Sequence, residues 1–107
     1  MGYSVVITER AKHDIDEAIR HIATDSLPAA TRWNDKFIAT TEILADTPFQ
    51  FSLISEVHKL KREYRSANLH SHRVIFRVLE ENQTVLILRV YHGSRRPLTS
   101  IDLEPEY

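Results

Sequence analysis

Residues 72–97 read HRVIFRVLEENQTVLILRVYHGSRRP and contain two apolar runs separated by a short polar segment. Arg73–Leu79 and Thr84–His92 are rich in β-branched residues and alternate in polarity, which is typical of strands. Glu80–Gln83 joins them as a short polar turn, so the two runs should form an antiparallel hairpin. One face of this hairpin carries six apolar side chains and is expected to pack against helices. These six are Val74, Phe76, Val78, Leu86, Leu88 and Val90.

The register of the hairpin determines which side chains gather on its opposite face. Cross-strand partners share a face, and a three-residue turn at Glu81–Gln83 keeps the six apolar residues together. This turn places Arg73 opposite Tyr91 and Ile75 opposite Arg89. The outer, concave face would then present polar groups that could bind an anionic partner. The alternative is an ordinary solvated face, on which arginine stems cover apolar neighbours. The polar members of this face are Arg73, Arg77, Arg89 and Tyr91.

The N-terminal half predicts one strand followed by two helices. Tyr3–Thr8 is short and β-branched, as expected of a strand. Apolar residues then recur at three- and four-residue spacing over about 9–25 and again over about 27–46. Thr8 can cap the first helix, and Pro28 is compatible with the first turn of the second. The acidic side chains of the first helix are expected on its solvated side, which argues against a catalytic carboxylate pair. They are Asp14, Asp16 and Glu17.

These elements predict an α+β fold. Tyr64–Leu69 adds a third β-like run before the hairpin, while residues 47–63 have the irregular pattern of a loop or a weak short strand. The expected order is an N-terminal strand, an antiparallel helical hairpin and a three-stranded antiparallel meander, with the helices packed on one face of a single sheet. A chain of 107 residues has room for one domain, which we expect to span residues 1–107.

Composition and charge restrict the classes of function. The chain has no cysteine, which excludes disulfides and thiolate metal sites. It has neither a leader-like N-terminus nor a run of 18 apolar residues, so we expect a cytoplasmic protein without membrane contact. The formal charge is −4 over residues 1–57, +6 over 58–96 and −3 over 97–107. The basic block could mark a surface for an anionic partner, and chance clustering of solvated charges is the alternative.

The histidines give weaker signals. His92 at the end of the hairpin could act as a general acid or base, because imidazoles exchange protons near neutral pH, or it could be a structural residue. His70 and His72 have a metal-ligand spacing, but no third ligand is evident from the sequence. Two glycines in the whole chain cannot build a Gly-rich phosphate loop. We therefore expect neither a metal nor a cofactor.

The segment HRVIFRVLEENQTVLILRVYHGSRRP (72–97) resembles the C-terminal half of RelE/ParE family toxins of type II toxin–antitoxin systems, also described as plasmid stabilisation proteins. In that family an Arg opens one strand, a short acidic turn follows, and an apolar strand ends in a His-Gly-x-Arg-like tip. The opening ITERAKHDIDEAIRHIA (7–23) is similar to the family's first strand and helix. The resemblance covers nearly the whole chain and is weakest across residues 49–62.

The resemblance implies one of two activities. RelE-like members cut mRNA in the ribosomal A site without a metal, using basic residues to hold and neutralise the scissile phosphate. ParE-like members bind and inhibit DNA gyrase and are not nucleases. By position, Arg73 matches the Arg that opens the third strand, and Arg95 matches the Arg after the tip glycine. Arg96 is a neighbouring candidate, Arg65 lies near a basic position of the preceding strand, and His92 lies beside the tip.

Departures from the RelE-like pattern favour the ParE-like branch. RelE-like toxins present two lysines on the preceding strand, where YRSANL (64–69) supplies only Arg65, and a tyrosine past the tip, where residues 97–100 supply none. The YHGSRRP tip (91–97) is closer to the ParE-like ending. We therefore expect a gyrase inhibitor in a hetero-oligomer with a cognate, acidic and apolar antitoxin. The alternatives are a RelE-like endoribonuclease that acts on the ribosome and mRNA, and an inactive relic that binds only its antitoxin.

Overall fold

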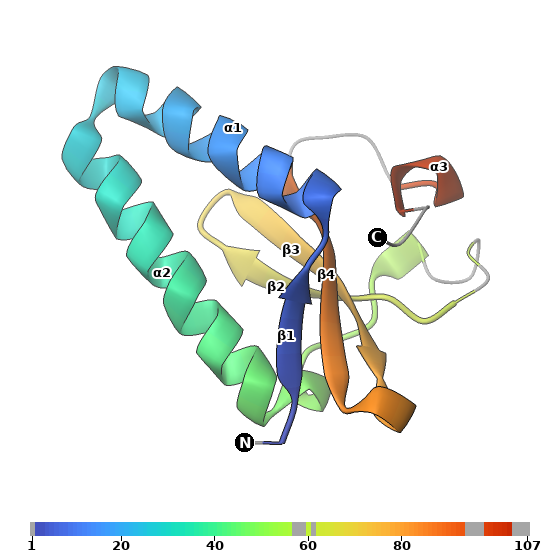
Figure 1. Cartoon of the computed structure of the whole chain (residues 1–107). Coiled ribbons are helices and arrows are strands. Elements are labelled where there is room, and N and C mark those ends of the chain that lie inside the picture. Colours follow the sequence, from blue (N-terminus) through green and yellow to red (C-terminus); the bar gives the residue numbers. More distant parts are fainter. Residues whose placement is uncertain (1, 57–59, 61, 94–97, 104–107) are drawn as a thin grey trace.

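A computed structural model describes residues 2–56, 60, 62–93 and 98–103. Its centre is a four-stranded sheet in the order β1-β4-β3-β2, and a hairpin of two long helices lies against one face (Figure 1). β1 (Ser4–Ile7) runs parallel to β4 (Thr84–His92). β4 is antiparallel to β3 (His72–Leu79), which is antiparallel to β2 (Arg65–Leu69). The expected α+β architecture, with its strand, helical hairpin and meander, is confirmed.

The two helices have the bounds that their apolar periodicity predicts. α1 spans Glu9–Asp25, and the Thr8 hydroxyl accepts a hydrogen bond from the Ala11 N–H at 3.2 Å. α2 spans Leu27–Asp46, and the Ser26 hydroxyl caps it through the Ala29 N–H. Among the described residues, no helix is both long enough and apolar enough to cross a membrane.

The main hydrophobic core lies between the helical hairpin and the sheet. Each helix contributes its apolar stripe, and β2, β3 and β4 contribute the side chains that face it. Burial of this apolar surface supplies most of the driving force for folding. The buried members are Ala11, Ala18, Trp33, Phe37, Leu44, Ala67, Leu69, Val74, Phe76, Val85, Ile87 and Val90.

A β-bulge in β4 changes which of its side chains face the helices, so the expected apolar face of the hairpin is partly wrong. Arg73 pairs with Tyr91 and Ile75 with Arg89, as predicted, but Phe76 pairs with Ile87, so Leu88 is an extra residue. A bulge of this kind reverses which side chains share a face beyond it. Phe76 and Val90 therefore face the helices as expected, whereas Leu88 does not.

The connection between β3 and β4 explains this shift in strand register. η3 (Glu80–Asn82) and the left-handed Gln83 form a four-residue connection between Leu79 and Thr84, in place of the three-residue turn predicted at Glu81–Gln83. Near the turn, the helix-facing residues of β4 are therefore Val85 and Ile87 rather than Leu86 and Leu88.

The outer face of the sheet is covered, which corrects the expectation of an open concave surface. A second apolar cluster forms there from sheet residues and from segments that cross over them, including α3 (Ser100–Leu103). Residues 47–63 contribute η1 (Pro48–Gln50) and an isolated bridge between Leu53 and Arg65. The buried members are Ile54, Tyr64, Ile75, Leu86, Leu88, Tyr91, Leu98 and Leu103. Arg73 and Arg89 on this face consequently lie within packed structure, with side chains 25% and 11% exposed.

Candidate functional site

Arg73 lies at the start of β3 on the outer face, and its guanidinium is held by a buried carboxylate. The Arg73 Nη2 atom donates to Glu56 Oε2 at 3.2 Å, and the same oxygen accepts the Leu98 N–H at 2.9 Å. The Arg73 side chain is 25% exposed and that of Glu56 only 9%. Arg73 is thus half-buried and ion-paired, which corrects the expectation of a freely exposed arginine.

The pKa of Glu56 reflects this environment. Burial alone raises the pKa of a carboxyl, but the Leu98 N–H and the Arg73 guanidinium stabilise the charged form more strongly and lower the Glu56 pKa to about 2. The carboxylate therefore stays ionised at neutral pH. It joins the segment before β2 to β3 and to the chain after the tip.

Arg65 at the start of β2 also makes structural contacts. Its Nη1 atom donates to the Phe51 carbonyl at 2.7 Å, and its guanidinium lies 5.0 Å from the centroid of the Phe49 ring. A cation over an aromatic face is held by the ring quadrupole. Arg65 therefore fixes the segment after α2 onto the edge strand.

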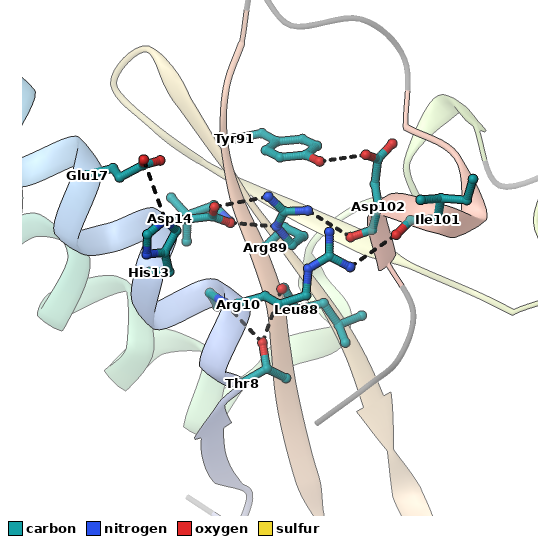
Figure 2. A network of polar contacts seen from close by, with 12 residues as sticks. Thr8, Arg10, His13, Asp14, Glu17, Leu88, Arg89, Tyr91, Ile101 and Asp102 are labelled. Atoms are coloured by element: carbon teal, nitrogen blue, oxygen red, sulfur yellow. Dashed lines mark hydrogen bonds and ion pairs between the residues drawn. The ribbon is translucent and has the colours of Figure 1, made fainter.

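Arg89 forms the centre of a polar network between α1, β4 and α3 (Figure 2). Its guanidinium donates to both carboxylate oxygens of Asp14, at 2.7 and 3.0 Å, and to the Asp102 carbonyl at 3.0 Å. The guanidinium also lies 4.5 Å from the centroid of the Tyr91 ring, and the Tyr91 hydroxyl donates to Asp102 Oδ1 at 2.8 Å. This network attaches α3 to the outer face.

Asp14 also binds the backbone of β4, beyond the point where β4 pairs with β1. β1 pairs with β4 only as far as Ile87, so the backbone of β4 beyond it needs other partners. The Thr8 hydroxyl donates to the Leu88 carbonyl at 3.1 Å, and Asp14 Oδ2 accepts the Val90 N–H at 2.9 Å. Asp14 is buried, which corrects its assignment to the solvated side of the helix. The carboxylate replaces a ladder bond that β1 cannot supply.

His92 ends β4 beside a surface pocket of about 300 Å³ between α1 and the hairpin. It pairs with His72 across the strands, and the two imidazole centroids are 5.2 Å apart. Burial lowers the pKa of His72, and the neighbouring His92 and His21 lower it further, because two adjacent cations repel. The pocket is lined by Asp14, Glu17, Ala18, His21, His72, Val90 and His92.

The tip after β4 begins with a close approach of two backbones. The Gly93 N–H donates to the Ser71 carbonyl at 2.6 Å, and a Cβ atom at Gly93 would lie 3.1 Å from that same oxygen. Glycine therefore suits this position because its backbone lies tightly against the β2–β3 turn. Arg95 and Arg96 lie outside the described residues, so their assignment to the site stays a prediction.

The expected site residues that the structure describes, Arg65, Arg73 and His92, make separate contacts. Arg65 and Arg73 hold different segments on the outer face, and His92 lies with His72 by the pocket next to α1. Within the described ranges, no group of three or more His, Cys, Asp or Glu residues could hold a metal ion. Sequence reasoning did not select three carboxylates of this region: Glu56 pairs with Arg73, Asp14 pairs with Arg89, and Asp102 accepts the Tyr91 hydroxyl.

Comparisons with known proteins identify the fold and the family. A family model described as the ParE toxin of the type II toxin–antitoxin system parDE matches residues 5–97. The structure is similar to a chain of the chromosomal ParDE system from P. aeruginosa, with a TM-score of 0.69 and 22% identity over 85% of this chain and 96% of that one. No curated protein matches the sequence significantly.

Two further solved structures are similar. One is a chain of the RelBE2 toxin–antitoxin complex from Mycobacterium tuberculosis, with a TM-score of 0.53, 26% identity and coverage of 86% and 99% of the two chains. The other belongs to the archaeal RelE–RelB complex from Pyrococcus horikoshii OT3, with a TM-score of 0.59, 25% identity and coverage of 90% and 100%. Because the ParE family model extends from β1 through the tip that follows β4, this chain belongs to the ParE toxin family of type II toxin–antitoxin systems, within the RelE/ParE superfamily.

Proposed function

We propose that this ParE-family toxin acts by binding and inhibiting DNA gyrase. The observation that carries the proposal is the match of the ParE family model over residues 5–97. The engagement of the candidate arginines supports it: Arg73 is neutralised by Glu56, and Arg65 is bound to a backbone carbonyl. A nuclease of the RelE-like kind needs such groups available to neutralise phosphoryl charge. A toxin that acts by binding can instead use them to shape its surface.

The second candidate is a RelE-like, ribosome-dependent endoribonuclease. The likeness to the RelBE2 and RelE–RelB structures, at 26% and 25% identity, favours keeping it. In this activity Arg73 and Arg95 would bind the mRNA phosphate, and Arg73 would have to exchange Glu56 for that phosphate. The third candidate is a relic that has kept only antitoxin binding. Gyrase and the ribosome are both cytoplasmic, so the first two candidates place the chain there.

The proposal includes a cognate antitoxin. The solved relatives include toxin–antitoxin complexes from M. tuberculosis and P. horikoshii. The +6 charge of residues 58–96 favours an acidic partner, because complementary charge gives fast association and specificity. We expect the protein encoded beside this toxin to co-purify with it as a hetero-oligomer, more tightly in low salt than in high salt. Binding that is absent or independent of salt would contradict this part of the proposal.

Induced expression in a bacterial host without the antitoxin distinguishes the three candidates. Gyrase inhibition should induce the SOS response and filamentation. Ribosome-dependent cleavage should instead arrest translation rapidly and leave cut transcripts, while a relic should cause no growth defect. Co-expression of the antitoxin should restore growth in the first two cases, and rapid translation arrest without SOS induction would overturn the gyrase proposal.

A further inference from the structure

Three histidines from three different elements line the pocket of about 300 Å³ beside the end of β4. His21 lies on α1, His72 on β3 and His92 on β4. His72 and His92 are direct partners across the two strands, and their imidazole centroids are 5.2 Å apart with the ring planes at 74°. Because the charge of an imidazole changes near neutral pH, the charge of this cluster depends on pH in the physiological range.

The surroundings of His72 favour its neutral form. Its ring meets the Trp33 ring of α2 edge-on, with centroids 5.3 Å apart, and its strand partner on β2 is the buried Leu69. Burial lowers the pKa of His72, and repulsion from His92 and His21 lowers it further. At neutral pH His72 is therefore uncharged and packs as an aromatic ring.

Negative groups near the cluster offset this repulsion only in part. Asp14 raises the pKa of His72, but the Asp14 carboxylate is already bound by other donors. These donors are Arg89 and the Val90 N–H. Glu17 also lines the pocket, and because its side chain is 66% exposed, water and salt screen its charge. Protonation of both imidazoles therefore leaves excess positive charge at the pair. The adjoining pocket beside Trp33 adds two further groups that are or can become positive, Arg32 and His70.

The histidine pair adjoins the hydrogen bond that holds Gly93 on the β2–β3 turn. Ser71 and Gly93 flank the pair in the sequence, and the Gly93 N–H donates to the Ser71 carbonyl at 2.6 Å. Backbone hydrogen bonds at the end of a strand ladder open locally, at a much lower free-energy cost than unfolding of the whole domain. Repulsion between charged His72 and His92 therefore acts directly on this bond. Arg95, a candidate target residue, lies two positions beyond Gly93 in the sequence.

We propose that the His72–His92 pair is a pH-sensitive switch, which opens the hydrogen bond between Gly93 and Ser71 and weakens target binding when both imidazoles are protonated. At neutral pH the rings pack edge to face and leave the bond intact. In mild acid, two cations at this separation repel strongly because the site is partly shielded from water. The effect on target binding rests on the proposed function, whereas the structural switch stands without it.

Amide hydrogen exchange of the purified toxin, corrected for the intrinsic effect of pH on exchange, tests the structural switch. Between about pH 7.5 and about pH 5.5 the protection of the Gly93 N–H should fall about tenfold, which corresponds to about one pKa unit of repulsion. The Val90 N–H, which Asp14 binds, should keep its protection and serves as the internal control.

Variants test whether His72 carries the effect. His72→Phe keeps an aromatic ring against Trp33 but cannot be protonated, so the protection of Gly93 should stay constant over the same range of pH. The matched control is His13→Phe, because the His13 side chain is 72% exposed on α1 and lies outside the pocket, and it should behave as the wild type does. Protection of Gly93 that is constant in the wild type, or that falls equally in His72→Phe, would overturn the switch.

The imidazole ¹H–¹³C signals of His72 measure the coupling within the pair. In His92→Gln, which removes the neighbouring cation, the pKa of His72 should rise toward 6.5. An unchanged His72 pKa would show that the two rings do not interact, and it would overturn the proposal even if His72→Phe failed to fold.

Gyrase inhibition at two pH values tests the effect on target binding. From about pH 7.5 to about pH 6, the toxin concentration for half-inhibition should rise about tenfold more for the wild type than for His72→Phe, a comparison that cancels the effect of pH on gyrase itself. An equal change in both proteins would overturn this part of the proposal. Absence of inhibition at every pH would instead contradict the gyrase target, while hydrogen exchange would still decide the switch.

Discussion

Replacement of Asp14 by alanine is the most informative test of how the fold is held. The Asp14 carboxylate accepts three hydrogen bonds, two from Arg89 at 2.7 and 3.0 Å and one from the Val90 N–H at 2.9 Å. The side chains of Asp14 and Arg89 are only 6% and 11% exposed. Asp14→Ala therefore leaves a nearly buried guanidinium and a buried backbone N–H without their acceptor. Breaking a buried pair in this way costs about 3–5 kcal/mol in the free energy of unfolding.

The matched control is Asp16→Ala, on the same helix two residues away. Asp16 is 68% exposed and lies 3.5 Å from Arg20, so its loss should cost less than about 1 kcal/mol. Urea unfolding followed by circular dichroism measures both values, and Asp14→Ala should also lower the melting temperature by about 12 °C or more. Asp14→Asn keeps an acceptor for Val90 and should fall between the two. Equal effects of the Asp14 and Asp16 replacements would refute the structural role of the network.

Other predictions concern the outer face, the histidines and the tip. The pKa of Glu56 is lowered from 4.5 to about 2 by folding, so the contribution of Glu56 to the free energy of unfolding should be complete above about pH 4.5 and disappear as the pH falls toward 2. In acid unfolding, Glu56→Gln should therefore reduce the dependence of stability on pH. Arg73→Ala should lower the free energy of unfolding by about 1–3 kcal/mol, as measured by urea unfolding. If Glu56→Gln reduces toxicity as much as Arg73→Ala does, Arg73 has a structural role. If only Arg73→Ala reduces toxicity, Arg73 contacts the target. Because the folded His72 pKa is lowered from 6.5, stability should decline as the pH falls below about 6.5, and less so in His72→Phe; identical melting profiles would contradict this. Arg95→Ala should reduce toxicity in a growth assay with a nearly unchanged melting temperature, and full toxicity would exclude a role for Arg95.

The elements of the fold are predictable because two independent periodicities agree. The three- and four-residue spacing of apolar side chains fixes both helices, and capping by Thr8 and Ser26 fixes where they begin. The bulge is not predictable in the same way. Residues 85–88 are all apolar, so either alternation could face the helices, and the choice depends on the turn and on tertiary packing.

The carboxylates of the candidate site differ in how visible they are in the sequence. Asp14 lies three residues after Ala11 and four before Ala18, and both alanines are buried, so the helical stripe itself points to a buried aspartate. The polarity of the Asp14 side chain suggests instead that it is exposed to solvent. Glu56 and Asp102 lie in or after irregular segments, where no periodicity predicts burial. The roles of Arg73 and Arg89 could not be predicted because these long-range partners are set by the folded chain.

A DNA supercoiling assay with purified gyrase tests the central claim most directly. The toxin should inhibit supercoiling of relaxed plasmid in proportion to its concentration, and equimolar antitoxin should restore the activity. In a parallel reaction with programmed ribosomes, the same toxin preparation should leave the mRNA intact. Undiminished supercoiling together with mRNA cut on the ribosome would contradict the account and assign the chain a RelE-like activity.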